Sequence, residues 1–160
     1  MSQPDLRGLM LRLFLPFAAG YLLSYLYRTV NAVLGPVIAG ELALPDYALG
    51  LLTSAYFLAF GAAQLPLGML LDRYGPRRVE ASLLVIAALG AMVFALADGL
   101  TALTLGRALI GLGVSACLMA SFKAFTQWFP PERQASLTGW IMASGGLGAL
   151  AAAKPLEITL

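Results

Sequence analysis

Hydrophobic residues fill five long stretches of this chain, and short polar or glycine- and proline-containing segments separate them. The stretches cover about residues 11–35, 47–71, 79–97, 101–128 and 134–153. Each is almost continuously apolar and long enough to cross a bilayer as an α-helix, which takes about 20 residues. Membrane-spanning β-strands are about half as long and alternate between apolar and polar positions. The pattern therefore predicts an all-α bundle of about five transmembrane helices.

Glycine, proline and charged residues mark the breaks between these helices. Gly35-Pro36 is expected to end the first helix, because proline disrupts the interior of a helix. Asp98-Gly99 is expected to form the turn after the third helix, and the charged stretch 72–78 to separate the second from the third.

The composition indicates that lipid is the solvent. Of 160 residues, 60% are hydrophobic and 11% are charged, whereas ordinary globular domains have about 45–50% and about 25%. The apolar run from Leu13 to about Gly35 is too long for the core of a cleaved signal peptide, which spans roughly 7–15 residues. We therefore expect it to remain as the first helix, with the lipid bilayer as a partner of the protein.

The arginines predict how the helices are oriented. If the helices alternate in direction, one side of the membrane receives Arg7, Arg12, Arg73, Arg77, Arg78 and Arg133. The connections on the other side carry the acidic residues Glu41, Asp46 and Asp98 and no lysine or arginine. Cytoplasmic loops are rich in lysine and arginine. The prediction is an integral protein of a plasma (bacterial inner) membrane with a cytoplasmic N-terminus.

Several classes of site are excluded by the residue types that are scarce. The chain has no histidine and one cysteine, Cys117, which argues against a classical zinc site and against histidine-dependent triads. The net charge of +2 is small and dispersed, so no nucleic-acid surface is expected. We therefore expect no metal, no cofactor and no enzymatic activity.

The segment after the second predicted helix is the most specific in the chain. It reads Gly68-Met69-Leu70-Leu71-Asp72-Arg73-Tyr74-Gly75-Pro76-Arg77-Arg78. This loop motif (residues 68–78) resembles the conserved loop between helices two and three of the major facilitator superfamily, G-x-L-x-D-R-x-G-R-R/K-R/K. It departs from that pattern at Pro76, where the family usually has a basic residue. Residues 107–113 and 128–133 also resemble family segments in helix four and before helix five, so the resemblance covers essentially the whole chain.

The resemblance implies a secondary transporter that works by alternating access, as a symporter or an antiporter. Family members resemble two six-helix bundles with the substrate between the halves. This chain would be a partial N-terminal domain, as a fragment, a natural short product or a frameshift, and a C-terminal half or a second copy would complete the pathway. In the family, the aspartate of the motif contacts the C-terminal half in one state. The implied conformational-switch residues are Gly68, Asp72, Arg73, Gly75, Arg77 and Arg78.

Two arginines, Arg28 and Arg107, fall inside predicted membrane helices, where ionisable residues are functional candidates. Arg28 shares a helix face with Tyr21, Ser24, Tyr25 and Asn31. Its position also resembles the helix-one arginine of organic-anion transporters in the superfamily. The eight acidic residues fall at predicted helix ends or in loops. We therefore expect no acidic partner within the membrane for either arginine.

The predicted function is transport of a small solute, with an anion as the favoured substrate and a proton as a candidate coupling ion. The predicted substrate-binding residues are Tyr25, Arg28, Asn31, Gln64 and Arg107. A purely structural role remains open for Arg107, and an interhelical hydrogen bond for Gln64. The alternative function is a truncated membrane assembly element that transports nothing.

Small residues recur every fourth position along the fifth predicted helix. One line holds Ala135, Gly139 and Ala143, and another holds Ser144, Gly148 and Ala152. Such lines are typical of close contact between membrane helices. We expect both to be packing surfaces rather than substrate contacts.

Overall fold

The structure is a computed structural model that describes residues 8 and 10–157. Its elements are η1 (Met10–Phe14), α2 (Leu15–Glu41), α3 (Ala48–Tyr74), α4 (Pro76–Ala95), α5 (Leu100–Val114), α6 (Cys117–Trp128) and α7 (Pro131–Glu157). Every element within the described residues is helical, which confirms the all-α prediction. By length and composition, five helical spans could cross a membrane, with α5 and α6 forming one of them.

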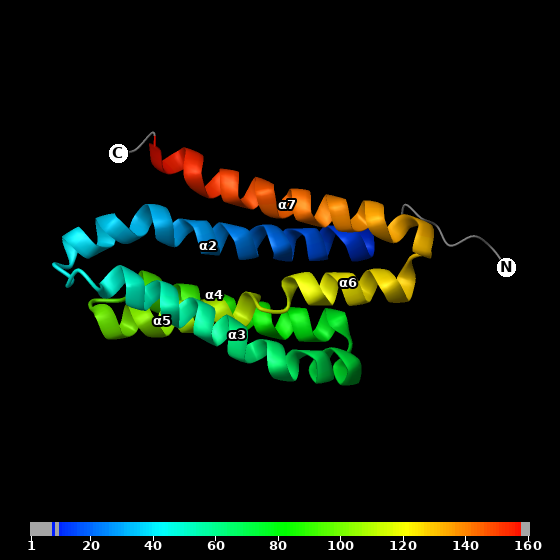
Figure 1. The fold of residues 1–160 in the computed structure, drawn as a ribbon, viewed down its shortest axis with the longest axis horizontal. Coiled ribbons are helices and arrows are strands. Elements are labelled where there is room, and N and C mark those ends of the chain that lie inside the picture. The colour runs from blue at the N-terminus through cyan, green and yellow to red at the C-terminus, as the bar shows by residue number, and fades with distance from the viewer. Residues whose placement is uncertain (1–7, 9, 158–160) are drawn as a thin grey trace.

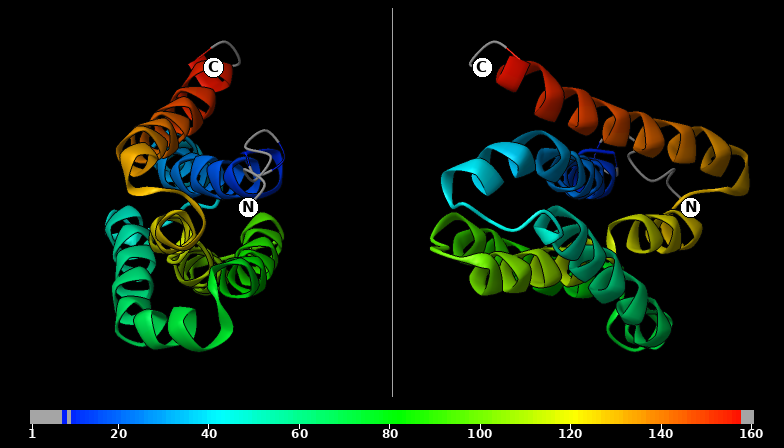
Figure 2. Two further views of the ribbon diagram at one scale, coloured as in Figure 1. Left: turned by 90° about the vertical axis from the view of Figure 1, so that its right-hand side faces the viewer. Right: turned by 60° about the vertical axis from the view of Figure 1, so that its left-hand side comes forward.

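The long helices run roughly along one axis and form two groups (Figures 1 and 2). In the first group α2 and α7 lie side by side, and in the second α5 contacts both α3 and α4. The short helix α6 contacts α2, α4 and α7 and so joins the groups. The most deeply buried large side chains include Leu52, Tyr56, Leu67, Leu103 and Phe125.

Glycine lets α4 and α5 approach each other closely. A Cβ atom on Gly90 would lie 2.7 Å from the Cβ of Leu109, and one on Gly106 would lie 2.8 Å from the Cβ of Phe94. Both positions are therefore closed to any side chain. Small residues at such crossings let membrane helices pack backbone to backbone.

The helix α7 packs on α2 along one of its two lines of small residues. The hydroxyl of Ser144 donates to the Ala18 carbonyl at 3.2 Å, and Gly148 faces the backbone of Leu22. The other line is exposed, and no atom in the described part of the chain lies within 4 Å of a Cβ built on Gly139. The expectation of a packing surface is therefore confirmed for the Ser144 line, and for the Ala135 line it stays a prediction.

The first membrane helix does not end at Gly35-Pro36. The helix α2 continues through Pro36 to Glu41, so the predicted stop is wrong. Membrane helices tolerate internal proline because local adjustments satisfy the freed backbone groups.

The turn between α3 and α4 is much tighter than the predicted break over residues 72–78. Gly75 alone separates the two helices, with φ +80° and ψ 156°. That conformation is essentially restricted to glycine. Pro76 is the first residue of α4, where its fixed φ suits the start of a helix. The departure of Pro76 from the family pattern thus has a local structural reason.

The fourth span is interrupted, although the sequence predicts one continuous helix over 101–128. The helix α5 ends at Val114 and α6 starts at Cys117. The hydroxyl of Ser115 donates to the Leu112 carbonyl at 2.7 Å, and this local bond competes with helical pairing. The interruption leaves the Ser115 carbonyl to accept a bond from another helix.

Candidate substrate site inside the bundle

Arg28, on α2, is surrounded by aromatic rings instead of acidic groups. Its Cζ atom lies 5.1 Å from the ring centroid of Tyr25 and 5.6 Å from those of Phe57 and Phe60. Cations at this range are attracted to the faces of aromatic rings. The Nε atom is buried and has no hydrogen-bond partner among the described residues. The guanidinium is therefore held in place but keeps an unused donor.

Arg107, on α5, is more deeply buried, with 3% of its surface exposed. Its Nη1 atom donates to the Tyr27 carbonyl on α2 at 3.0 Å, one residue before Arg28. Its Cζ atom lies 4.8 Å from the ring centroid of Tyr56. Within residues 10–157 its Nε atom also lacks a hydrogen-bond partner.

The two arginines share one aromatic wall on α3, formed by Tyr56, Phe57 and Phe60. Tyr56 meets Phe57 edge to face at 5.1 Å and stacks on Phe60 at 6.3 Å, measured between ring centroids. The Tyr56 hydroxyl is buried without a partner in the described part of the chain. This wall thus has a cation from α2, a cation from α5 and, within the described residues, a hydroxyl without a hydrogen-bond partner.

The remaining predicted site residues divide into two groups. The Tyr25 ring lies against Arg28, and Asn31 lies about one turn further along α2, where its Nδ2 atom donates to Thr53 Oγ1 at 3.2 Å. The Asn31 Oδ1 atom is buried and unpaired among the residues described. Gln64 instead donates to the Ser115 carbonyl at 3.2 Å. That is the interhelical bond which the sequence left open as its alternative role.

The chain matches a known protein family over most of its length. The family model described as Major Facilitator Superfamily matches residues 17–154. The chain belongs to the major facilitator superfamily. With its membrane-spanning helices, it is an integral membrane protein.

Relatives within the superfamily are named as transporters rather than as enzymes. The chain is 35% identical over 96 residues to a nitrate/nitrite transporter of Picosynechococcus sp., a match that covers 60% of this chain and 18% of that protein. It is 31% identical to a hexuronate transporter of Bacillus subtilis, with 82% of this chain and 31% of the relative covered. It is 32% identical to a probable L-galactonate transporter of Escherichia coli, with 85% and 30% covered. The chain thus spans about a third or less of the length of these relatives.

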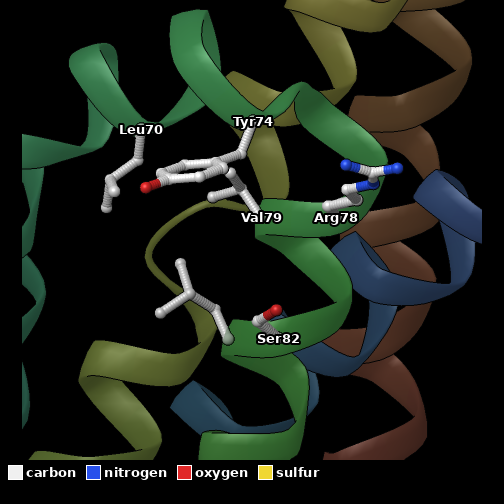
Figure 3. A pocket seen from close by; sticks show the side chains of 6 residues that line it. Leu70, Tyr74, Arg78, Val79 and Ser82 are labelled. Atoms are coloured by element: carbon white, nitrogen blue, oxygen red, sulfur yellow. The ribbon is translucent and has the colours of Figure 1, made fainter.

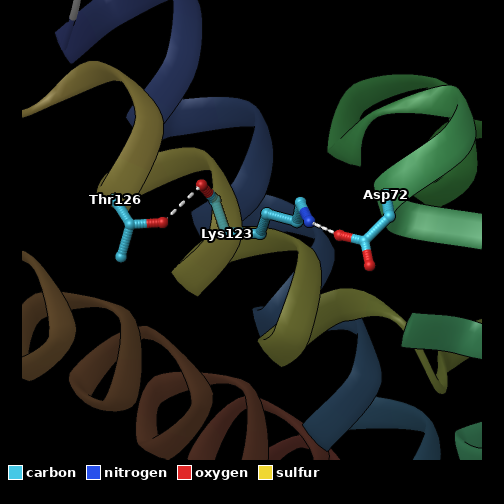
Figure 4. A network of polar contacts seen from close by, with 3 residues as sticks. All are labelled: Asp72, Lys123 and Thr126. Carbon is cyan, nitrogen blue, oxygen red and sulfur yellow. Dashed lines mark hydrogen bonds and ion pairs between the residues drawn. The ribbon is translucent and has the colours of Figure 1, made fainter. Parts of the chain in front are cut away.

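The superfamily loop motif lies at the end of the bundle where α3 turns into α4. Asp72 forms an ion pair with Lys123 of α6 (Figure 4). The Asp72 side chain is 70% exposed and that of Lys123 is 27% exposed. Lys123 lies near the end of α6, where the Thr126 hydroxyl donates to its carbonyl at 2.9 Å.

Other residues of the loop motif line cavities at the same end. Arg78 and Tyr74 border a cavity of about 390 Å³ whose other lining is mostly apolar, from α3 and α4 (Figure 3). Gly68 and Asp72 border one of about 240 Å³ with Met119, Phe122 and Lys123. Arg73 lies over the Tyr74 ring at 5.4 Å. These motif residues therefore gather at one end of the bundle, apart from the arginine and aromatic cluster.

Sequence reasoning missed Glu80, on α4. Its position near a helix end suggested a solvated carboxyl, but the residue is only 5% exposed, and its Oε1 atom lacks a hydrogen-bond partner among the residues that the structure describes. Glu80 is therefore a buried acid, which its place among the eight acids at predicted helix ends and in loops does not reveal. Ala87, seven residues after Glu80, is also buried. Residues seven positions apart share a helix face, so this spacing is the sequence signal that places Glu80 on the buried face of α4.

Proposed function

We propose that this chain forms part of a secondary active transporter of small organic or inorganic anions, working by alternating access. The anion binds at the aromatic wall between Arg28 and Arg107. The observation that carries this proposal is the pair of arginines on one wall without an acidic partner in the described residues. The cost of keeping such charges in the membrane is compensated when an anion binds.

The chemistry of the guanidinium group favours flat oxyanions. Arginine presents a planar fork of N–H donors that matches carboxylate geometry, and such charged hydrogen bonds are roughly twice as strong as neutral ones. The named relatives carry nitrate or nitrite, hexuronate and, by name, L-galactonate, all of which are anions. This agreement supports a small carboxylate or inorganic oxyanion as the substrate class.

A complete pathway needs a second wall opposite this bundle. In transporters of this architecture the site lies between two halves, so we propose that a C-terminal half or a second copy supplies the facing surface. We call this chain with its second bundle the transport unit. The cavity beside Asp72 and Gly68 offers that partner a contact next to the Asp72–Lys123 pair, and breaking the pair would let the loop motif switch.

The charges support a cytoplasmic N-terminus. Arg73, Arg77, Arg78 and Arg133 all lie at the end of the bundle where α3 and α6 finish and α4 and α7 begin (Figure 1). The connections at the opposite end contain Asp46 and Asp98. By the positive-inside tendency, the arginine-rich end faces the cytoplasm.

Uptake by the transport unit tests the proposal. We expect Arg28→Ala to lower the rate of hexuronate or nitrate uptake by at least about tenfold, because one charged hydrogen bond contributes about 1.5–3 kcal/mol. The matched control is Arg133→Ala, which removes an exposed arginine at the start of α7 and should leave uptake unchanged. Undiminished anion uptake by Arg28→Ala would overturn the assignment.

The names of the relatives do not favour the alternative, a membrane element that transports nothing. Sizing in detergent and cross-linking would separate the two functions. A particle that holds only one bundle has no opposing wall, and we expect no alternating access from it. A particle with two bundles, together with anion uptake, is the result that the transport proposal predicts.

A further inference from the structure

We propose that Glu80 binds the coupling proton of this transporter. The inference rests on the proposed transport function and adds the ion that drives it. Its starting point is a buried acid that the anion site does not use, since Glu80 lies on α4 and the arginines lie on α2 and α5.

The carboxyl of Glu80 is enclosed by neighbouring helices. A Cβ atom built on Gly20 of α2 would strike its Oε1 atom, and Cys117 of α6 lies beside it. Only 5% of the residue is exposed, and Oε1 has no hydrogen-bond partner within the described chain. A carboxylate is costly in such surroundings, whereas the protonated, neutral form is not. The geometry is therefore that of a carboxyl holding a proton.

A cavity gives this carboxyl a route to water. It has a volume of about 230 Å³ and is lined by Arg12, Pro16, Phe17, Arg77, Glu80, Ala81 and Leu84. Arg12 and Arg77 are exposed and stand where α2 and α4 begin. A proton from the water at this end of the bundle can therefore reach Glu80 without crossing the packed core.

The same cavity offers the ionised carboxylate a place to go. Charged groups from two elements border this cavity together with Glu80: Arg12 from η1, and Arg77 from α4, three residues before Glu80. Among the described residues, the thiol of Cys117 on α6 is the other titratable group beside the Glu80 carboxyl. When water removes the proton, the carboxylate is drawn toward the arginines and away from Gly20. When a proton returns to the carboxylate oxygen, the contact with α2 is restored.

This exchange couples the proton to the anion site because both act on α2. Gly20 lies about two helical turns before Arg28 on the same helix. A change in how α2 rests on Glu80 therefore shifts the helix that carries Arg28 and the Tyr27 carbonyl. Protonation and anion binding would favour the same packing of α2, which is the condition for coupled transport.

Infrared spectroscopy of the full chain in lipid tests the protonation directly. A protonated carboxyl has a carbonyl stretch that ionised carboxylates lack. We expect this band at neutral pH in the unmodified chain, its loss in Glu80→Gln and its retention in Glu132→Gln, which alters an exposed acid of α7. The glutamine keeps the shape of the neutral acid, so the bundle should still fold. Absence of the band, or its persistence in Glu80→Gln, would overturn the inference.

Transport separates this inference from the proposed function. In the transport unit, Glu80→Gln should abolish anion accumulation driven by a proton gradient but retain anion exchange without a gradient, and Glu80→Asp should restore part of the accumulation. Arg28→Ala should lose both activities. If Glu80→Gln still accumulates the anion, the coupling role is wrong and the anion site stands. If the unmodified unit carries no anion, the proposed function fails, and the coupling role with it.

Discussion

Charged side chains have different surroundings in two regions of the bundle. At the loop motif, Asp72 and Lys123 pair across α3 and α6 in an exposed position. In the interior, the described residues that contact Arg28 and Arg107 are aromatic rings and a backbone carbonyl, and each arginine has a buried Nε atom without a hydrogen-bond partner among them. Exposed pairs contribute little to stability, whereas buried uncompensated charges reduce it. The interior arginines thus lower the stability of the fold. A bound anion that pairs with their charge would explain why the protein has them.

The strongest test of this contrast is Arg107→Met. We expect it to weaken anion binding by the transport unit by up to about 100-fold, through loss of a charged hydrogen bond. The melting temperature should stay level or rise, because an apolar side chain of similar length replaces a buried cation. Titration calorimetry and thermal unfolding measure the two effects.

Arg133→Met is the matched control for that experiment, since Arg133 is exposed at the start of α7 and its replacement should affect neither quantity. Loss of both affinity and thermal stability in Arg107→Met would contradict the contrast, because Arg107 would then be a structural residue.

The next largest effect is expected for Gly75→Ala. This variant tests whether the conformation of the loop motif depends on the backbone geometry of Gly75 or on the charged side chains. A side chain at φ +80° and ψ 156° should lower the free energy of unfolding by about 1–3 kcal/mol. Chemical denaturation in detergent measures this loss. Gly68→Ala is the comparison, since nothing in the described structure lies within 4 Å of a Cβ there. Equal losses for both variants would contradict the assignment.

Tyr56→Phe sharpens the view of the interior site. Removing the buried, unpaired hydroxyl should not lower stability, because in the described chain it breaks no hydrogen bond. If the hydroxyl donates to the bound anion, affinity should fall by about tenfold, in line with about 1.4 kcal/mol. Anion titration of both proteins decides this. Unchanged affinity would remove Tyr56 from the site.

The smallest effect on stability is expected at the exposed ion pair. Asp72→Asn should lower the free energy of unfolding by no more than about 1 kcal/mol, and added salt should erase the difference. Uptake should change more than stability if the pair belongs to the switch. A large loss of stability that persists in high salt would show that the pair is structural.

The sequence predicted features that depend on local pattern. The five apolar runs identify the membrane spans, and helical spacing places Tyr25 beside Arg28, as the structure has it. The sequence also predicts the charged break before α4, but not that Gly75 alone forms the turn between α3 and α4. These features follow from residues within one helix or one turn.

Features that depend on how helices are rotated against each other were not predictable. The bond from Arg107 to the Tyr27 carbonyl joins residues 80 positions apart, and no periodicity within α5 indicates its partner. The break at Ser115 arises in a span where Gly111 and Gly113 press against the backbones of α3 and α4. The burial of Glu80 is a feature of the same kind, because it depends on α2 lying over the carboxyl.

The glycine contact between α4 and α5 has a mechanical consequence. Gly90 and Gly106 bring the two backbones together, and this close contact opposes sliding of one helix past the other, so we expect α4 and α5 to move as one rigid unit. The boundary with fewer contacts lies between two groups of helices, α2 with α7 on one side and α3, α4 and α5 on the other. The bond from Arg107 to Tyr27 crosses that boundary. We therefore expect an anion that draws Arg107 toward itself to weaken this contact between the two groups of helices.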